Sequence, residues 1–398
     1  MIIGILKEGK EPVDRRVPLT PEQCKHLMTS YRSIQIIVQK SDFRCFSDQE
    51  YINSGVKVVD DISEADILLG IKEVPKTELI PHKIYFYFSH TIKKQPYNKG
   101  LLCKMIDLNI KMIDYEVIKD ENGKRLIGFG RYAGIIGAYN ALLAYGIKSQ
   151  KYNLDAAYNC FNKDMMLQQL INLDLNQEKI VITGSGKVAL GAIETLCNAG
   201  ITEVNKQDFL SKKNSSPVFL RLDTLDYNIR KDSTKSNKQN FYDYPEEYIS
   251  DLARYLKSSD IFISGHFYSI GSPVLLTKKD LINTNVKVIA DISCDINGPI
   301  ASTIRSSSII DPIYGYNTKL FKEDDDLENI DVIAVMAVDN LPCELPKDSS
   351  EDFGNQLIKN VFPLLINDEN MILDKATICE KGALTRNFTY LSSYISGD

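Results

Sequence analysis

The chain has 398 residues, of which 43% are hydrophobic and 25% are charged, and its formal net charge is −6. The length favours two domains, and the composition is typical of a globular protein and excludes a disordered or fibrous one. The acidic balance argues against nucleic acid as a partner, and no apolar run reaches membrane-spanning length, so we expect a cytoplasmic protein that acts on small molecules.

The first third of the chain alternates short β-rich runs with helical patterns. The helix expected over residues 20–28 has a clear start signal, because Thr20 can cap it, Pro21 suits the first helical position and Gln23 completes a capping box. The alternation is typical of a parallel sheet covered by helices. The β-rich runs are IIGIL, SIQIIVQ, ILLGI, IYFYF and KMIDY.

Two of these runs end on side chains that can transfer a proton. Lys72 closes the run ILLGIK and His90 closes the run IYFYFSH. Ligands of open α/β sheets bind at the carboxyl ends of the strands, so we expect the ammonium and the imidazole to share one crevice. The alternative is that each is a solvated polar residue at a strand end.

A second set of strands follows residues 132–145, a helical segment rich in small residues that can pack tightly between domains. The near-continuous apolar character of these strands suits burial on both faces. A helix over residues 349–365 indicates that the chain returns to the first domain. The predicted fold class is therefore α/β with two parallel sheets, the first domain being discontinuous. The strands are KIVIT (179–183), IFIS (261–264), VKVIA (286–290) and VIAVMAV (332–338).

A glycine-rich turn follows the strand KIVIT and precedes a helical pattern. Gly184 and Gly186 allow a tight turn and a close approach of the backbone to a pyrophosphate, which the amides and the dipole of the new helix would bind. Alanine at the third position is an accepted variant of this fingerprint. The turn predicts dinucleotide binding, and a purely structural turn is the alternative. The loop residues expected at the cofactor are Gly184, Ser185, Gly186, Lys187 and Val188.

The next strand should end on an acid that binds the adenosine ribose hydroxyls, about twenty residues after the loop. Residues 203–210 are expected to hold this strand end, with Asp208 as the candidate. Lys206 lies in the same region and would favour a 2′-phosphate, so the choice between NAD and NADP stays open. His266, after the run IFISG, is expected to line the cofactor crevice. The polar segment 230–240 is expected to be an exposed excursion.

Further charged residues accompany the proton-transfer pair. Arg16 and Arg125 can grip carboxylates with two hydrogen bonds, which suits a dicarboxylate substrate, and a plain charged surface is the alternative. Glu73 and Glu116 can restrain the cations or bind a cationic end of the substrate. The eight cysteines contain no CxxC pair and there are only four histidines, so we expect reduced thiols and no metal site.

Seven motifs occur in order along nearly the whole chain: GILKEGKEPVDRRVPLTP, GIKEVP, FYFSHTIKKQPYNKGLL, IDYEVIKDENGKRLIGFGRYAG, TGSGKVALGA, IADISCDINGPI and AVDNLPCELPKDSSEDFG. Together they resemble lysine ketoglutarate reductase, the reductase half of a bifunctional lysine-degrading enzyme, and the related lysine-forming saccharopine dehydrogenases. The same outline is fainter in alanine dehydrogenase and in the soluble part of proton-pumping transhydrogenase.

The resemblance implies two Rossmann-like domains with the active site in the cleft between them. Residues 1–131 and 340–398 would form the substrate and catalytic domain, and residues 132–339 the dinucleotide-binding domain. Lys72 and His90 match the acid/base pair of the family, and Arg16 and Arg125 match the side chains that hold the oxo-acid carboxylates. The matching neighbouring charges are Lys10, Glu73 and Glu116. The matching groups near the cofactor are Gly265, Asp291, Asp339 and Asn340.

The resemblance also implies a reaction, the reductive condensation of L-lysine with 2-oxoglutarate to saccharopine or its reverse, with NAD or NADP as the cofactor. His90 suits the proton shuttle, and Lys72 needs a lowered pKa to act as a base. An alanine-dehydrogenase-like reaction with ammonia is an alternative, although the charges around the pair favour a larger, doubly charged substrate. A catalytically inactive dinucleotide-binding homologue is the third possibility.

Overall fold

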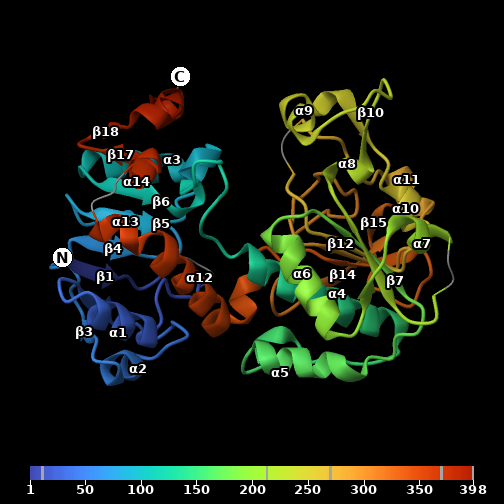
Figure 1. Ribbon diagram of the computed structural model, residues 1–398, viewed down its shortest axis with the longest axis horizontal. Coiled ribbons are helices and arrows are strands. Elements are labelled where there is room, and N and C mark those ends of the chain that lie inside the picture. The colour runs from blue at the N-terminus through green and yellow to red at the C-terminus, as the bar shows by residue number, and fades with distance from the viewer. Residues whose placement is uncertain (10–12, 212–213, 269–270, 368–370, 397–398) are drawn as a thin grey trace. The chain divides into compact units, whose positions relative to one another are not determined.

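The computed structural model describes residues 1–398 except 10–12, 212–213, 269–270, 368–370 and 397–398 (Figure 1). The chain forms two compact units, the first from Met1–Phe129 with Pro346–Asp398 and the second from Gly130–Leu345. Each unit is built on one eight-stranded sheet. The predicted α/β class with two Rossmann-like, mainly parallel sheets is confirmed.

The first unit has the strand order β18-β17-β6-β5-β4-β1-β2-β3. In this order, the strands from β6 to β3 are parallel. β17 runs antiparallel to β6, and β18 runs antiparallel to β17. Because β4 and β5 are neighbours, the carboxyl ends that carry Lys72 and His90 lie at the same edge of the sheet. The bounds are β1 (Ile2–Ile5), β2 (Gln35–Gln39), β3 (Lys57–Val59), β4 (Ile67–Leu69), β5 (Ile84–Tyr87), β6 (Lys111–Asp114), β17 (Thr377–Glu380) and β18 (Ala383–Leu384).

The helices of the first unit come from both ends of the chain. The capping box predicted for α1 is present, because the Thr20 side chain accepts from the Gln23 amide and the Gln23 side chain accepts from the Thr20 amide. Nε2 of Gln23 also donates to the carbonyl of Glu351 in α12 at 2.8 Å, which ties the returning segment to the first unit. The helices are α1 (Pro21–Ser30), α2 (Asp48–Asn53), α3 (Pro96–Asp107), α12 (Pro346–Asn360), α13 (Phe362–Ile366), α14 (Met371–Lys375) and α15 (Ser392–Ser396).

The second unit has the strand order β15-β14-β16-β13-β12-β7-β9-β8. In this order, the strands from β16 to β8 are parallel. At one edge, β14 runs antiparallel to β16 and β15 runs antiparallel to β14. A separate antiparallel pair, β10 (Asn228–Arg230) and β11 (Tyr248–Ser250), lies outside this sheet. The sheet strands are β7 (Lys179–Thr183), β8 (Thr202–Glu203), β9 (Val218–Leu222), β12 (Ile261–Ser264), β13 (Val288–Asp291), β14 (Ile313–Asn317), β15 (Lys322–Glu323) and β16 (Val332–Met336).

Small residues bring two helices of the second unit into backbone contact. A Cβ atom on Gly134 would lie 1.9 Å from the carbonyl oxygen of Val188, and one on Gly191 would lie 2.0 Å from that of Arg131. The small-residue helix therefore packs on α6 inside this unit. The helices are α4 (Gly130–Ser149), α5 (Lys163–Gln168), α6 (Lys187–Asn198), α7 (Lys206–Ser211), α8 (Thr224–Tyr227), α9 (Lys238–Asp243), α10 (Ala253–Leu256) and α11 (Lys278–Ile282).

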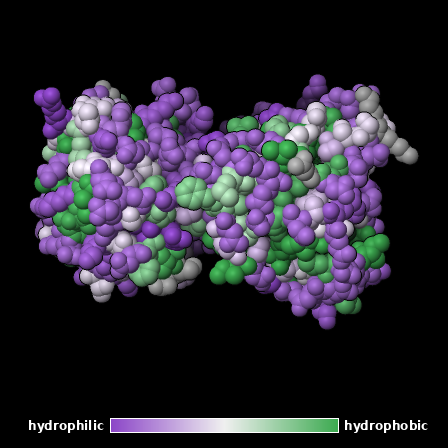
Figure 2. Space-filling view, turned by 90° about the horizontal axis from the view of Figure 1, so that it is seen from below, coloured by the Kyte–Doolittle hydropathy of each residue, from purple (hydrophilic) through white to green (hydrophobic). Residues whose placement is uncertain are grey.

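The surface is mainly polar. On the face shown in Figure 2, hydrophilic residues predominate and hydrophobic ones form smaller patches between them. None of the helices in the described ranges has both the length and the apolar character needed to cross a bilayer. All eight cysteines are free thiols.

A buried carboxyl group makes the stability of the second unit depend on pH. Glu344 accepts a hydrogen bond from Nδ2 of Asn140 at 2.8 Å, and burial raises the pKa of Glu344 from 4.5 to about 8. The folded state holds this proton more tightly, so the stabilisation is complete below pH 4.5 and is lost as the pH rises to about 8.

We expect Glu344→Gln to remove this loss, because glutamine stays neutral and keeps an acceptor for Asn140. In urea unfolding at pH 8 the variant should gain up to about 5 kcal/mol over the wild type, and the two proteins should converge near pH 4.5. The same pH dependence in both proteins would contradict the assignment.

Candidate functional site

The carboxyl edge of the first sheet holds the predicted acid/base residues. Lys72 follows β4 and His90 follows β5. These strands are parallel neighbours, and their pairing begins with Ile67 opposite Ile84. Nδ1 of His90 lies 2.6 Å from Oε1 of Glu73. A hydrogen bond to this carboxylate fixes the orientation of the imidazole and makes Nε2 the nitrogen that can exchange a proton with a substrate. The structure thus joins two of the predicted residues directly.

The backbone around His90 is held in an unusual conformation. His90 has a φ of 52°, which places it in the left-handed region that few non-glycine residues adopt. Its ring stacks on Phe88 with the centroids 6.5 Å apart. The preceding residue, Ser89, donates its amide to the buried carboxylate of Asp114 at 3.0 Å. These contacts hold the imidazole at the sheet edge.

Glu8 anchors the end of β4, and the sequence analysis missed it. Its two carboxylate oxygens accept from the amides of Ile71 at 2.6 Å and Lys72 at 2.9 Å. Burial, with a smaller contribution from the Asp14 carboxylate, raises the pKa of Glu8 to about 8. The sequence feature that could have identified Glu8 is its place shortly after the first strand, at the same sheet edge as Lys72.

Arg16 is buried and paired within the chain. Its Nε and Nη2 atoms donate to the carboxylate of Asp14 at 3.0 and 2.6 Å, and its guanidinium lies 4.0 Å from the ring centroid of Phe129. Burial alone would raise the pKa of Asp14, but the charge and hydrogen bonds of Arg16 hold it well below its usual range. Lys10 lies outside the described residues.

Glu116 and Arg125 form a second charged group after β6. Nη2 of Arg125 lies 3.0 Å from Oε1 of Glu116, and Nζ of Lys93 lies 3.7 Å from the same oxygen. Oε2 of Glu116 is buried and accepts no hydrogen bond from the described residues. An unsatisfied buried acceptor costs about 1–3 kcal/mol, so this oxygen is suited to a donor brought by a ligand.

The glycine-rich turn of the second unit combines a close backbone approach at one glycine with open space at another. Gly184 has a φ of 103°, and a Cβ there would lie 2.5 Å from the carbonyl oxygen of Gly265, so the structure brings these two predicted residues together. A Cβ on Gly186 would meet nothing within 4 Å, which leaves open space before the backbone. Lys187 and Val188 begin the twelve-residue helix α6. The positive dipole end of this helix suits a phosphate there.

The neighbouring strand ends carry the other predicted cofactor residues. Nδ1 of His266 lies 2.8 Å from Oγ1 of Thr183, while its Nε2 is buried without a partner among the described residues. Burial lowers the pKa of His266 to about 4, so the ring is neutral at pH 7. This orphaned nitrogen fits a ligand group in the crevice.

Asp291 and the residues after β16 have different environments. Asp291 accepts from the hydroxyl groups of Ser293 at 2.9 Å and Thr303 at 2.7 Å, so its carboxylate supports the loop after β13. Asp339 is exposed, and Nδ2 of Asn340 lies 2.9 Å from the sulfur of Cys343. The hydrogen bonds of Asp291 are therefore structural, whereas the carboxylate of Asp339 is exposed and open to a ligand.

Strand β8 ends at Glu203, inside the range 203–210 where a strand end was expected, but Asp208 is not the residue at that end. β8 contains only Thr202–Glu203, and Asp208 lies in the short helix α7. The strand beside β7 is β9, whose last residue Leu222 pairs with Thr183. Asp223 follows it and therefore takes the position predicted for Asp208, because the segment with α7 is inserted between the loop and this strand. The run VFLRLD, an apolar strand that ends on an acid, was the signal.

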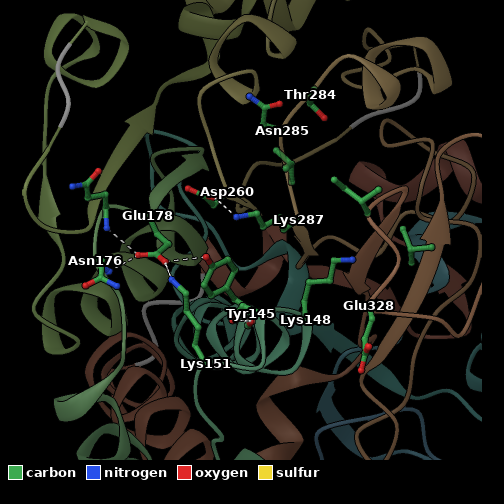
Figure 3. A pocket seen from close by; sticks show the side chains of 15 residues that line it. Tyr145, Lys148, Lys151, Asn176, Glu178, Asp260, Thr284, Asn285, Lys287 and Glu328 are labelled. Atoms are coloured by element: carbon green, nitrogen blue, oxygen red, sulfur yellow. Dashed lines mark hydrogen bonds and ion pairs between the residues drawn. The ribbon is translucent and has the colours of Figure 1, made fainter.

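A cavity of about 970 Å³ lies at the opposite, amino edge of the second sheet (Figure 3). Three charged residues that line it each directly precede a strand: Glu178 precedes β7, Asp260 precedes β12 and Lys287 precedes β13. Glu178 pairs with Lys151, and Asp260 lies 3.0 Å from Lys287. These charges are paired with one another, and the glycine-rich turn is at the other end of the strands, so the candidate chemistry does not lie here.

No group of three or more His, Cys, Asp and Glu side chains is arranged to bind a metal ion in the parts of the chain that the structure describes.

Comparison with known proteins agrees with this arrangement. Residues 4–136 match the family described as alanine dehydrogenase/PNT, N-terminal domain. An L-alanine dehydrogenase structure superposes with a TM-score of 0.64 at 15% identity, covering 99% of this chain and 100% of that one. The transhydrogenase from Sinorhizobium meliloti gives a TM-score of 0.59 at 15% identity, covering 97% and 99%. At these identities the likeness establishes the fold.

Sequence relatives extend over nearly the whole chain. The mitochondrial alpha-aminoadipic semialdehyde synthase of Bos taurus is 28% identical over 98% of this chain and 47% of its own length, and the alpha-aminoadipic semialdehyde synthase of Arabidopsis thaliana is 30% identical over 98% and 41%. The chain thus spans about half the length of these relatives. Saccharopine dehydrogenase [NAD(+), L-lysine-forming] of Yarrowia lipolytica is 25% identical over 93% of this chain and 94% of its own. The resemblance found in the ordered motifs is confirmed: the chain is a homologue of the alpha-aminoadipic semialdehyde synthases and of the lysine-forming saccharopine dehydrogenases, an oxidoreductase family.

Proposed function

We propose that this protein is an NAD(P)-dependent oxidoreductase that condenses L-lysine with 2-oxoglutarate and reduces the product to saccharopine, or catalyses the reverse. The observation that carries the proposal is the placement of Lys72 and the His90–Glu73 pair at the ends of adjacent strands. Homology over 98% of the chain to alpha-aminoadipic semialdehyde synthases supports it.

The second unit would bind the dinucleotide. The turn at Gly184 and the first amides of α6 would hold the pyrophosphate, and Asp223 would accept from the ribose hydroxyls. The orphaned Nε2 of His266 would meet a polar group of the cofactor. When bound, a nicotinamide cofactor supplies the hydride, while the protein supplies position and electrostatics.

The first unit would move the protons. Lys72 would take a proton from the ε-ammonium of lysine, so that the free amine can attack the ketone. His90 would deliver a proton from Nε2 to the hydroxyl of the carbinolamine, so that water leaves and an imine forms. Glu73 would hold the imidazole in position for this transfer, since it contacts Nδ1 at 2.6 Å.

The charged group after β6 would contribute to substrate binding. The buried Oε2 of Glu116 lacks a donor among the described residues, and a substrate ammonium would supply one. Arg125 is about half exposed and can form two hydrogen bonds to a carboxylate. Both charges suit a substrate pair that carries an amine and several carboxylates.

An alanine-dehydrogenase-like reaction is the second candidate, because residues 4–136 match the domain of that family. An assay of cofactor oxidation with 2-oxoglutarate or pyruvate, lysine or ammonium, and NADH or NADPH separates the two. We expect turnover that requires lysine and 2-oxoglutarate together. Turnover with ammonium and pyruvate, and none with lysine, would favour the second candidate and refute the first.

A further inference from the structure

The segment between β9 and β12 makes a polar excursion that reaches the cofactor end of the second sheet. It includes α8, the β10–β11 pair and α9. Most of residues 230–240 are exposed, as expected. Lys238 begins α9, and its Nζ lies 2.5 Å from Oδ2 of Asp223. The excursion thus delivers a cation to the acid that follows β9.

Asp223 connects this cation to the glycine-rich turn. Its Oδ1 accepts from the Ser185 hydroxyl at 3.1 Å and from the Thr224 amide at 2.8 Å, while Oδ2 faces Lys238. The side chains of Asp223 and Lys238 are 41% and 45% exposed, so a ligand can reach both. The loop residue, the acid and the lysine form one polar group on a single unit.

An acid at this strand end normally distinguishes the two dinucleotides. It accepts hydrogen bonds from the ribose hydroxyls of NAD, and its charge opposes the 2′-phosphate of NADP, whereas a cation nearby accommodates that phosphate. Asp223 alone would therefore select NAD. Other cations of the region have partners of their own, since Arg221 lies 3.3 Å from Glu203 and Lys206 lies 2.5 Å from Asp226.

We propose that Lys238 is a specificity-determining residue that lets this site bind NADPH as well as NADH. With NADPH, the ammonium of Lys238 leaves Asp223 for the 2′-phosphate, and Asp223 keeps its bonds to Ser185 and Thr224. With NADH, Lys238 stays on Asp223, whose free lone pairs accept from the ribose. The inference rests on the proposed function only in that the second unit binds a dinucleotide.

Dissociation constants of NADH and NADPH, measured by calorimetry on the full chain, test the inference. We expect the wild type to bind both within about tenfold, and Lys238→Met to weaken NADPH by about tenfold or more while NADH changes less than about threefold. Asp223→Asn should weaken NADH more than NADPH. Lys235→Met is the matched control, because Lys235 is an exposed lysine of the same excursion and should change neither constant.

The contrary results separate this inference from the proposed function. If Lys238→Met and the charge reversal Lys238→Glu leave the ratio of the two constants unchanged, Lys238 does not determine specificity, although the enzyme proposal stands. A wild type that binds only NADH also overturns the inference. If the wild type binds neither dinucleotide, the proposed function fails as well. Equal circular dichroism spectra of variants and wild type show that the overall fold is kept, and an unchanged NADH constant in Lys238→Met shows that the cofactor end of the second unit is kept.

Discussion

Replacing Lys72 by Met and His90 by Gln together is expected to lower kcat for the lysine and 2-oxoglutarate reaction by about 10²- to 10⁴-fold. This is the contribution that positioned general acids and bases typically make. Both side chains lie at the carboxyl ends of the paired strands β4 and β5, and the glycine-rich turn belongs to the other unit. Steady-state kinetics should therefore show the lower kcat, while the dissociation constant of the dinucleotide should stay at its wild-type value.

The matched control is the double variant Lys76→Met and His82→Gln. These are a lysine and a histidine of the same unit, both exposed, and neither has a proposed role in proton transfer or substrate binding. We expect the control to keep wild-type turnover within about twofold, as surface substitutions usually do. Near wild-type turnover in the Lys72 and His90 variant would refute the assignment of the acid/base pair.

Asp14→Asn is expected to destabilise the first unit by about 3–5 kcal/mol, because it removes the carboxylate that is bonded to the buried guanidinium of Arg16. Arg16 is only 3% exposed and holds Asp14 with two hydrogen bonds. The bonded carboxylate has a pKa held below its ordinary 3.8, so its stabilising contribution is present above pH 3.8 and is lost as the pH falls further. The difference between variant and wild type should shrink accordingly in acid.

Urea unfolding at pH 7 measures this effect, with two comparisons. Asp374→Asn is the control, because its side chain is 61% exposed and lies 3.4 Å from Lys111, and it should change stability by less than about 0.5 kcal/mol. Adding Arg16→Met to Asp14→Asn should recover part of the loss, since it removes the buried cation to which Asp14 is bonded in the wild type. A loss below about 1 kcal/mol in Asp14→Asn would show that the pair is not important for stability.

The features that were predictable from the sequence are those set by local patterns. Apolar runs of four to seven residues marked the central strands of both sheets, because strands covered on both faces need continuous apolar side chains. The cap at Thr20 depends on residues only three positions apart and appears as predicted. The turn at Gly184 was recognisable because its backbone requires glycine.

The features that were missed depend on contacts between distant segments. Glu8 lies 63 and 64 positions from the amides that it accepts from, so no local spacing identifies it. Asp223 was missed because the acid was expected about twenty residues after the glycine-rich turn. The inserted segment with α7 places the end of β9 farther along the chain than that. The pairing of Arg16 with Asp14 spans only two positions, but the burial that makes it strong comes from the folded unit.

The most direct test of the proposed reaction is identification of its product. The full chain is incubated with L-lysine, 2-oxoglutarate and NADH that carries deuterium at the transferable position of the nicotinamide, and the mixture is analysed by mass spectrometry. The account predicts saccharopine that is heavier by a single mass unit, because the hydride enters the new carbon–nitrogen bond site. Absence of saccharopine, together with transfer of deuterium to alanine in a parallel incubation that contains ammonium and pyruvate instead, would contradict it.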